Sequence, residues 1–152
     1  ADGQAATLAA ALADIALAPH EIGYMNAHAT ATRGGDVVEV EAIRRVFGEH
    51  VKSLPVSSTK SIHGHLLGAA SAIELAISVL ALQQSFLPAT AHLHDVDPEC
   101  DLVHVADAPR FDQSFEHALS LSAGFGGTNV ALVVSKEHEL PRGPLSHAAT
   151  PT

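Results

Sequence analysis

Glu74 is the only carboxylate in a long run of apolar and small residues from His65 to Leu82. Burying an ionised carboxylate in such surroundings costs several kcal/mol unless a cation or strong hydrogen-bond donors accompany it. The nearest cation in a loop of unusual composition is Lys60, within the Ser/Thr-rich segment 57–61. We therefore expect Lys60 and Glu74 to form an ion pair, with the His65 imidazole beside them. A fixed charge next to an imidazole has the components of an active site.

His28 is a second candidate, because it ends a short apolar run and opens a stretch rich in Thr and Gly. The run from Ile22 to His28 predicts a β-strand, and the stretch that follows to Gly35 predicts a loop at its carboxyl end. In α/β proteins this is the usual place for a functional site. A lone histidine on an apolar segment is more often a structural core residue, so His28 needs further support.

Three motifs supply that support, because they resemble the motifs of one enzyme family. Segments 56–61 (VSSTKS) and 64–70 (GHLLGAA) are similar to the lysine-histidine motif of β-ketoacyl-(acyl carrier protein) synthases, members of the thiolase-like superfamily. Segment 26–32 (NAHATAT) is similar to the family's first histidine motif, usually NAHGTST, and segment 124–129 (GFGGTN) to its terminal glycine-rich turn. The motifs occur in the family's order. The chain thus resembles the C-terminal portion of a KAS II-like synthase of type II fatty acid or polyketide synthesis.

The resemblance implies a decarboxylative Claisen condensation. A cysteine thiolate takes the acyl chain from acyl carrier protein, malonyl-carrier protein loses carbon dioxide, and the carbanion attacks the acyl thioester. His28 and His65 match the residues that donate hydrogen bonds to the malonyl thioester oxygen, where enolate charge develops. Lys60 would orient the site and bias histidine protonation, and Glu74 would balance its charge. Because the substrates are carried on the phosphopantetheine of acyl carrier protein, we expect no cofactor.

The resemblance also assigns binding and gating residues. Thr30 and Thr32 match residues that hold the phosphopantetheine arm. The backbone N–H of Phe125 matches part of the acyl oxyanion hole, and its ring matches the gate of the acyl pocket, which the flexible glycines around it allow to move. Ala123 stands where a bulky aromatic is common, which favours a specialised or polyketide-type synthase. The expected pocket residues are therefore Ala123, Gly124, Phe125 and Gly126.

The cysteine nucleophile of this chemistry is missing from the sequence. Cys100 is the only cysteine, and it lies in the acidic segment 98–101, where thiolate formation is disfavoured. We therefore expect an incomplete enzyme that needs a Cys-bearing N-terminal half of the synthase, with acyl carrier protein as a further partner and a homo- or heterodimer as the assembly. The alternative is a non-catalytic, chain-length-factor-like partner subunit, although such a subunit has no chemical need for the residues described above.

The spacing of apolar residues predicts an α/β protein, and the resemblance makes it the C-terminal half of a thiolase-like layered α/β/α fold without its N-terminal counterpart. Residues 1–136 form the expected domain, and 137–152, which lack periodicity, are expected to be a flexible tail. We expect the helix at 65–82 to be buried on all sides, because it has no polar face. The expected elements are helices at about 4–17, from Asp36 onward and at 65–82, and strands at 22–28, 54–58, 118–122 and 128–134, the last two paired as a hairpin.

Asp36 and Glu39 resemble a capping box at the start of the second helix. A role beside Lys60 is the less favoured interpretation of these two carboxylates.

The composition excludes several classes of protein. A net charge of −9 argues against nucleic-acid binding, which needs a basic face. The absence of a signal-like start and the interruption of the long apolar run by Glu74 argue against secretion and against a membrane span, and the single cysteine fits a reducing cytoplasm. The pairs His63/His65 and His92/His94 could bind metal, but without a third ligand motif we expect no metal site.

Overall fold

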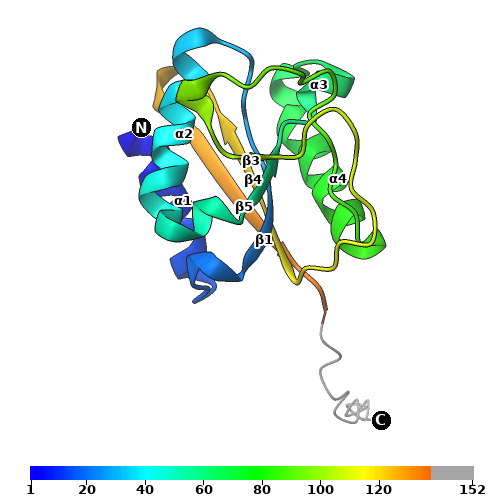
Figure 1. Ribbon diagram of the computed structural model, residues 1–152. Helices are drawn as coiled ribbons and strands as arrows, with labels where there is room; N and C mark the ends of the chain where they lie inside the picture. The colour runs from blue at the N-terminus through cyan, green and yellow to red at the C-terminus, as the bar shows by residue number, and fades with distance from the viewer. Residues whose placement is uncertain (138–152) are drawn as a thin grey trace, which may run out of the picture.

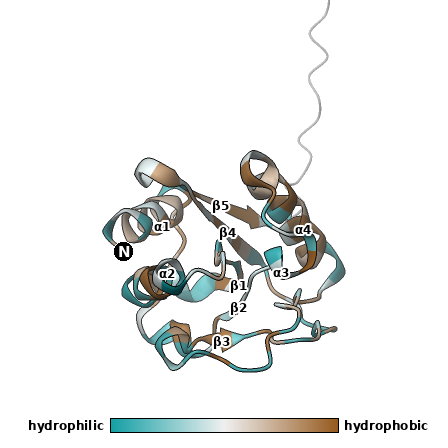
Figure 2. Cartoon of the chain, turned by 90° about the horizontal axis from the view of Figure 1, so that it is seen from above, coloured by the Kyte–Doolittle hydropathy of each residue, from teal (hydrophilic) through white to brown (hydrophobic). Residues whose placement is uncertain are grey.

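The structure, a computed structural model, describes residues 1–137 and consists of a mixed five-stranded sheet covered by helices on both faces (Figure 1). Helices α1 and α2 cover one face, and α3 and α4 lie over the other (Figure 2). The predicted α/β/α layering is therefore confirmed. The strand order is β3-β2-β1-β4-β5. The helices are α1 (Asp2–Asp14), α2 (Arg33–Phe47), α3 (Lys60–His63) and α4 (Ala70–Gln84), and the strands are β1 (Ile22–Asn26), β2 (Pro55–Ser57), β3 (Val103–His104), β4 (His117–Ala123) and β5 (Asn129–Ser135).

The direction of the strands determines where the loops gather. Strands β1, β2, β3 and β4 run parallel to their neighbours in the order given, and only β5 is antiparallel, in a hairpin with β4. Asn26, at the end of β1, pairs with Ser57 of β2 and with Ser120 of β4. The carboxyl ends of parallel strands meet at one edge of a sheet, and ligands bind there in open α/β folds. The loops after β1, β2 and β4, which carry the three motifs, therefore open at the same edge.

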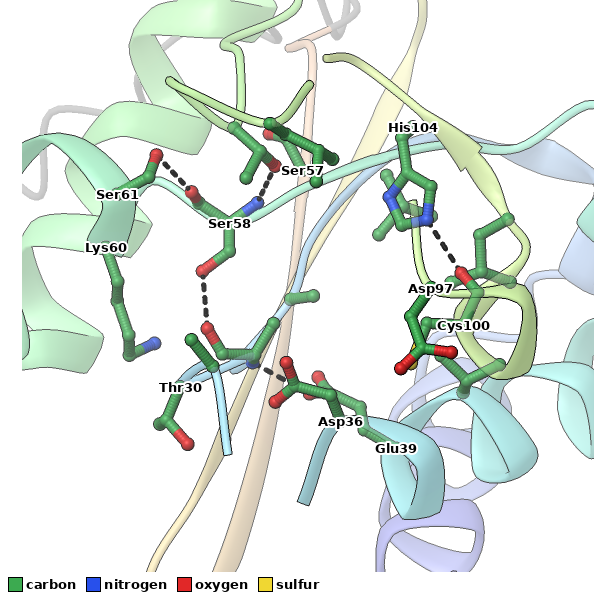
Figure 3. Close-up of a pocket in the computed structure, with 18 of the residues that line it drawn as sticks. Thr30, Asp36, Glu39, Ser57, Ser58, Lys60, Ser61, Asp97, Cys100 and His104 are labelled. Carbon is green, nitrogen blue, oxygen red and sulfur yellow. Dashed lines mark hydrogen bonds between the residues drawn. The ribbon is translucent and has the colours of Figure 1, made fainter. Parts of the chain in front are cut away.

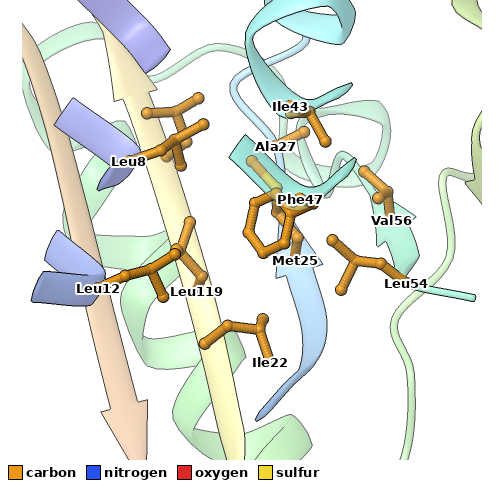
Figure 4. Close-up of a cluster of buried hydrophobic side chains, with 11 residues drawn as sticks. Leu8, Leu12, Ile22, Met25, Ala27, Ile43, Phe47, Leu54, Val56 and Leu119 are labelled. Atoms are coloured by element: carbon orange, nitrogen blue, oxygen red, sulfur yellow. The ribbon is translucent and has the colours of Figure 1, made fainter. Parts of the chain in front are cut away.

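Two apolar clusters hold the layers together, one on each face of the sheet. Because both faces are covered, β1 is buried almost throughout instead of alternating between apolar and polar residues. The first cluster lies under α1 and α2 (Figure 4), and the second lies under α4. The first contains Leu8, Leu12, Ile22, Met25, Ala27, Ile43, Phe47, Leu54, Val56, Leu119 and Leu121, and the second Tyr24, Ala81, Leu82, Leu87, Ala89, Val105, Phe115 and Ala118.

The predicted capping box at the start of α2 is wrong. The helix begins at Arg33, one turn earlier than expected, with Thr32 in an extended conformation as the N-cap residue. Asp36 therefore lies in the first turn of the helix instead of at the N-cap, and Glu39 lies further inside the helix. Glu39 faces the interior, one turn before Ile43 on the same buried stripe, which leaves its carboxylate free to bind another part of the chain.

The helix expected at 65–82 also differs from the prediction. It begins at Ala70, because Gly64 and Leu67 adopt positive φ angles that interrupt helical geometry. Only one stripe of α4 is buried, and Ile73 and Leu80 are exposed. The expectation of burial on all sides is therefore wrong for this chain. The buried residues of α4 are Ala70, Glu74, Ser78, Ala81 and Leu82.

By length and hydropathy alone, the stretch Leu67–Gln84 would be able to cross a membrane, a criterion that the core helices of many water-soluble proteins also meet. Only 28% of it is buried within this chain. Its carboxylate, Glu74, points into the protein and not outward.

The remaining predicted elements agree with the structure to within a few residues. The hairpin of β4 and β5 is present, with Ala123 paired to Asn129 next to the glycine turn. The tail predicted at 137–152 lies, apart from its first residue, outside the described residues.

Gly23 in β1 provides a test of how tightly the second cluster packs. A Cβ at this position would lie closer to the Cβ of Phe115 than packed carbon atoms approach one another. We expect Gly23→Ala to lower the free energy of unfolding by about 1 to 3 kcal/mol, the usual cost of overpacking. Gly34→Ala is the matched control. Gly34 lies in α2, and a Cβ at this position would meet no atom within 4 Å. It should leave stability unchanged or raise it by up to about 1 kcal/mol. Urea unfolding of the two variants measures the difference, and equal stabilities would show that the packing around Phe115 is loose.

Candidate functional site

A buried ion pair between Lys60 and Glu74 lies at the carboxyl edge of the sheet. Lys60 is the first residue of α3, directly after β2, and its ammonium group contacts a carboxylate oxygen of Glu74 on α4. The two side chains are 5% and 0% exposed, so neither charge is solvated by bulk water. Ser122 on β4 donates its hydroxyl to the second carboxylate oxygen of Glu74 at 3.4 Å. The predicted pair is confirmed, and a residue from a third element helps to hold it.

A buried polar network fixes the elements that carry this pair. Asn26, at the end of β1, donates from its side-chain nitrogen to Thr59 Oγ1 at 3.2 Å and to the backbone oxygen of Glu74 at 3.4 Å. Ser78 donates its hydroxyl to the same backbone oxygen at 2.8 Å. One asparagine thus joins β1, the segment after β2 and α4. Buried networks in which every member is satisfied are rigid, because breaking one bond leaves a costly unpaired group.

The two predicted histidines come together from separate loops. The rings of His28 and His65 contact edge to face, with centroids 5.6 Å apart and an interplanar angle of 85°. The backbone N–H of Leu67 donates to Nδ1 of His65 at 3.3 Å. Because Nδ1 accepts this bond, a neutral His65 carries its proton on Nε2 and can donate from that atom. His28 and His65 therefore form a pair of imidazoles close to the Lys60 and Glu74 charges.

His28 lies in surroundings that favour its neutral form. Burial, the positive charge of Lys60 and the neighbouring His65 together lower the pKa of His28 from 6.5 to about 4. Its Nδ1 atom is buried and has no hydrogen-bond partner among the described residues. At neutral pH the ring is uncharged, and a neutral imidazole offers one N–H donor and one acceptor. Such a ring can donate a hydrogen bond to a developing oxyanion without first losing a proton.

Glu39 positions the loop that carries His28, a role that the sequence did not predict. Its two carboxylate oxygens accept the backbone N–H groups of His28 and Ala29, each at 2.7 Å. Burial raises the pKa of Glu39 to about 7, while these two backbone N–H groups act to lower it. The available signal in the sequence was its place in the apolar stripe of α2, one turn before Ile43. A carboxylate in a buried stripe needs donors, just as Glu74 does.

A cavity of about 700 Å³ opens beside these groups (Figure 3). Lys60, His65, Thr30 and Thr32 all contribute to its wall. The hydroxyl oxygens of Thr30 and Thr32 lie 3.3 Å apart, so they form a joint donor and acceptor surface at the wall of the cavity. A ligand with amide groups could bind to this surface.

Cys100 also lines the cavity but is not equipped to act as a nucleophile. Burial raises the pKa of its thiol, and the carboxylates of Asp97, Asp36 and Glu99 raise it further. The thiolate is the reactive form, and it is disfavoured here. The prediction that Cys100 does not serve as the nucleophile is in agreement with these surroundings.

The glycine turn after β4 is not joined to the cavity within this chain. Phe125 has a fully exposed side chain, and the residues around it are not among those that line the cavity. The turn itself is well defined, because Gly124 donates its N–H to Thr128 O at 2.7 Å and Gly126 has a φ of 77°, a value that favours glycine. The site residues fall into two groups accordingly. The structure brings together His28, Thr30, Thr32, Lys60, His65 and Glu74. Ala123, Gly124, Phe125 and Gly126 lie at the same edge of the sheet but do not line the cavity.

Removing the positive charge of the buried pair tests its importance for stability. We expect Lys60→Met to lower the free energy of unfolding by about 3 to 5 kcal/mol, because it leaves the Glu74 carboxylate buried without a cation. The double variant Lys60→Met/Glu74→Gln should recover most of this loss, since neither residue then carries a charge. Lys52→Met is the control, because this exposed lysine pairs with an exposed glutamate and should change stability by less than about 1 kcal/mol. Denaturant unfolding measures all three, and a small effect of Lys60→Met alone would show that water reaches Glu74.

The pKa of His28 can be measured by NMR titration of its imidazole protons. We expect a value of about 4 in the unmodified chain. Because the unfolded chain binds the proton at pH values below 6.5, the contribution of His28 to stability should decrease as the pH falls from 6.5 to 4. In the double variant Lys60→Met/Glu74→Gln the pKa should rise part of the way towards 6.5, because burial still lowers it. Lys52→Met should leave it unchanged, and an equal shift in both variants would contradict the role of Lys60.

Comparison with known proteins places the chain in a family. Residues 1–94 match the β-ketoacyl synthase, C-terminal domain family. The 3-oxoacyl-[acyl-carrier-protein] synthase 2 of Coxiella burnetii is 43% identical over 136 residues, which cover 90% of this chain and 33% of the relative. The chain spans about a third of the length of the curated relatives it matches.

Solved structures with the same fold are ketosynthases. The ishigamide ketosynthase/chain length factor has a TM-score of 0.86 and 31% identity, covering 90% of this chain and 33% of that chain. The AntDE:AntF complex, a type II PKS acyl-carrier protein with its ketosynthase bound to the hexaketide, has a TM-score of 0.85 and 32% identity, covering 90% of this chain and 34% of that chain. The fold is the thiolase-like fold of these proteins, and the predicted resemblance is confirmed. The chain therefore belongs to the β-ketoacyl synthase family, as the C-terminal domain of such a synthase.

Proposed function

We propose that this chain completes the active site of a 3-oxoacyl-(acyl carrier protein) synthase and contributes its malonyl-decarboxylating half. The observation that carries the proposal is the contact between His28 and His65, with the buried Lys60–Glu74 pair beside them. Two imidazole donors at one point suit a reaction in which negative charge develops on a single oxygen.

The geometry supports the following reaction. The malonyl thioester binds with its carbonyl oxygen towards the two imidazoles. When the bond to the carboxylate carbon breaks, carbon dioxide leaves and the bonding electron pair moves into an enolate, whose oxygen accepts hydrogen bonds from His28 and His65. The enolate carbon then attacks an acyl thioester held on the cysteine of the N-terminal half, and the cysteine thiolate leaves. The new carbon–carbon bond belongs to the 3-oxoacyl product.

The other residues of the site act on this pair of imidazoles or on the carrier arm. Burial and, after it, the charge of Lys60 lower the pKa of His28, so that the ring is neutral and able to donate and accept at neutral pH. Thr30 and Thr32 face the cavity, where their hydroxyls can bind the amides of the phosphopantetheine arm. The backbone N–H of Phe125 donates to the acyl oxyanion. The exposed ring of Phe125 becomes the gate of the acyl pocket when the Cys-bearing N-terminal half covers the turn. Ala123, Gly124 and Gly126 of this turn shape the pocket. The reaction needs no cofactor.

The exposed apolar surface of the chain supports the need for a second segment. Leu67 is 73% exposed, and Ile73 and Leu80 on α4 are exposed as well. The outer face of β5 adds Val130 and Leu132. A monomeric protein rarely leaves such a surface open to water. We assign this surface to the Cys-bearing N-terminal half of the synthase and not to a membrane.

Further partners follow from the same proposal. Acyl carrier protein delivers the substrates, and the AntDE:AntF structure, in which an acyl-carrier protein is in complex with its ketosynthase, supports this partner. The assembled synthase acts as a dimer of identical or related subunits in the cytoplasm. The second candidate is a non-catalytic, chain-length-factor-like subunit, which the likeness to the ishigamide ketosynthase/chain length factor favours. The presence of His28, His65, Lys60 and Glu74 together favours the catalytic role, because a subunit that only shapes a pocket needs none of them.

A chimeric enzyme tests this function. The 136 residues of the Coxiella burnetii synthase that match this chain can be replaced by the corresponding residues of this chain. We expect the chimera to decarboxylate malonyl-carrier protein and to form 3-oxoacyl-carrier protein. His28→Ala or His65→Ala should lower the rate of decarboxylation by about a hundredfold or more, because each removes a donor to the enolate oxygen. Release of labelled carbon dioxide measures the first step separately from condensation.

His20→Ala is the control, since this histidine is exposed and lies before β1, away from the motifs. It should leave both rates unchanged. A folded chimera that decarboxylates equally well with and without the two histidines would refute the catalytic proposal. A folded chimera with no activity of its own would favour the chain-length-factor-like alternative.

A further inference from the structure

Three metal-binding side chains converge outside the site described above. His92, His94 and Asp107 each present one ligand atom, and these three atoms lie within 4.8 Å of one another. All three residues are exposed. The sequence alone did not reveal this cluster, because His92 and His94 are separated from Asp107 by the loop around β3. We propose that His92, His94 and Asp107 form a binding site for a zinc ion.

The fold fixes the two backbone segments that carry these residues. Thr90 donates its N–H to Val105 O at 2.8 Å, and Asp107 donates its N–H to Thr90 O at 3.0 Å. These two bonds flank an isolated parallel bridge between Thr90 and Ala106. Thr90 is thus hydrogen-bonded to both neighbours of Ala106. The segment that begins at Thr90 and contains His92 and His94 therefore stays beside Asp107. The ligand set is thus built on paired backbone.

Two of the three residues have left-handed backbone conformations. His92 has a φ of 63° and Asp107 a φ of 59°. His and Asp are among the non-glycine residues that tolerate this region best. In both places the chain turns sharply, so that successive side chains leave it in different directions. The ligand atoms of His92 and His94 nevertheless lie within 4.8 Å of each other.

The donor set suits zinc better than the hard cations. Two imidazole nitrogens and one carboxylate oxygen are ordinary zinc ligands, whereas calcium and magnesium bind almost only oxygen. Three protein ligands leave at least one coordination position for water, as in zinc sites that are not closed by a fourth side chain. The net charge of −9 favours the accumulation of cations near the protein.

A zinc ion at this place would fasten one wall of the cavity. Leu93, between the two histidines, lines the cavity, as do Asp95 and Asp97 just after them. The same segment is already attached to the Lys60 region, because Ala91 donates its N–H to Ser61 Oγ at 2.8 Å. A metal that joins His92 and His94 to Asp107 adds a second attachment at the outer side of the loop. The zinc site is independent of the proposed condensation, because none of its ligands belongs to the catalytic group.

The test is zinc binding by the untagged chain, measured by isothermal titration calorimetry and by the thermal unfolding midpoint with zinc or with EDTA. We expect one zinc ion per chain and a rise of about 5 to 10 °C in Tm when zinc is present at about a hundred times its Kd. His94→Ala and Asp107→Asn should weaken binding by about tenfold or more and remove most of the rise in Tm. Asn tolerates a left-handed backbone, so Asp107→Asn keeps the local conformation. Cobalt(II) in place of zinc should show visible absorption that both variants lose.

His20→Ala is the matched control, because it removes one exposed histidine elsewhere on the described surface and should leave the affinity unchanged. Each variant is folded if its Tm in EDTA equals the Tm of the unmodified chain in EDTA. If zinc does not raise the Tm, or if both His94→Ala and Asp107→Asn bind it as tightly as the unmodified chain does, the assignment is wrong. Loss of binding in these two variants with retention in the control establishes it, whatever the outcome of the condensation assay.

Discussion

The buried contact between Lys60 and Glu74 is the constraint around which the site is organised. Neither charge reaches bulk water, so each must keep the other as its partner. This requirement fixes α4 against α3, and Ser122 and Asn26 bring β4 and β1 into the same arrangement. The positive charge then acts on the neighbouring His28, whose pKa it helps to lower. Burial is the larger cause of this shift, so the ion pair adds to a neutral state of His28 that burial already favours.

The sheet explains why groups distant in the sequence act together. Parallel strands end at one edge, so the loops after β1 and β2 bring the two imidazoles into contact, and Glu39 on α2 holds the first of them through its backbone. The opposite layer behaves differently. Helix α4 buries Glu74 and Ser78 together with apolar residues, while Ile73 and Leu80 are exposed. These exposed apolar side chains are the part of the surface that we assigned to the N-terminal half of the synthase.

Much of the fold could be predicted from the sequence, and the reasons for the exceptions are physical. The Lys60–Glu74 pair was predictable because a carboxylate in an apolar run requires a cation, and the β4–β5 hairpin was predictable because two β-like runs flank a glycine turn. The start of α2 was not predictable, because Asp36 and Glu39 have the spacing of a capping box although the helix begins at Arg33. The contact of Glu39 with His28 and the approach of Asp107 to His92 were not predictable. Both depend on how strands and loops pair, and no local sequence pattern encodes this pairing. The exposure of Ile73 and Leu80 on α4 was not predictable either, because a run that is apolar on every side does not show which side packs against the sheet.

The pairing of β1 with β4 has a consequence for how this site comes into being during folding. Asn26 lies beside Ser120, a separation of about two thirds of the domain in sequence, and β1 is central in the sheet. Contacts between such distant segments form slowly, because a long loop must close before they contribute any stabilisation. Ser122, which binds Glu74, arrives only with β4. Helix α4 packs against β4 as well, so the place of this helix and the full environment of its carboxylate both depend on the closure of that long loop.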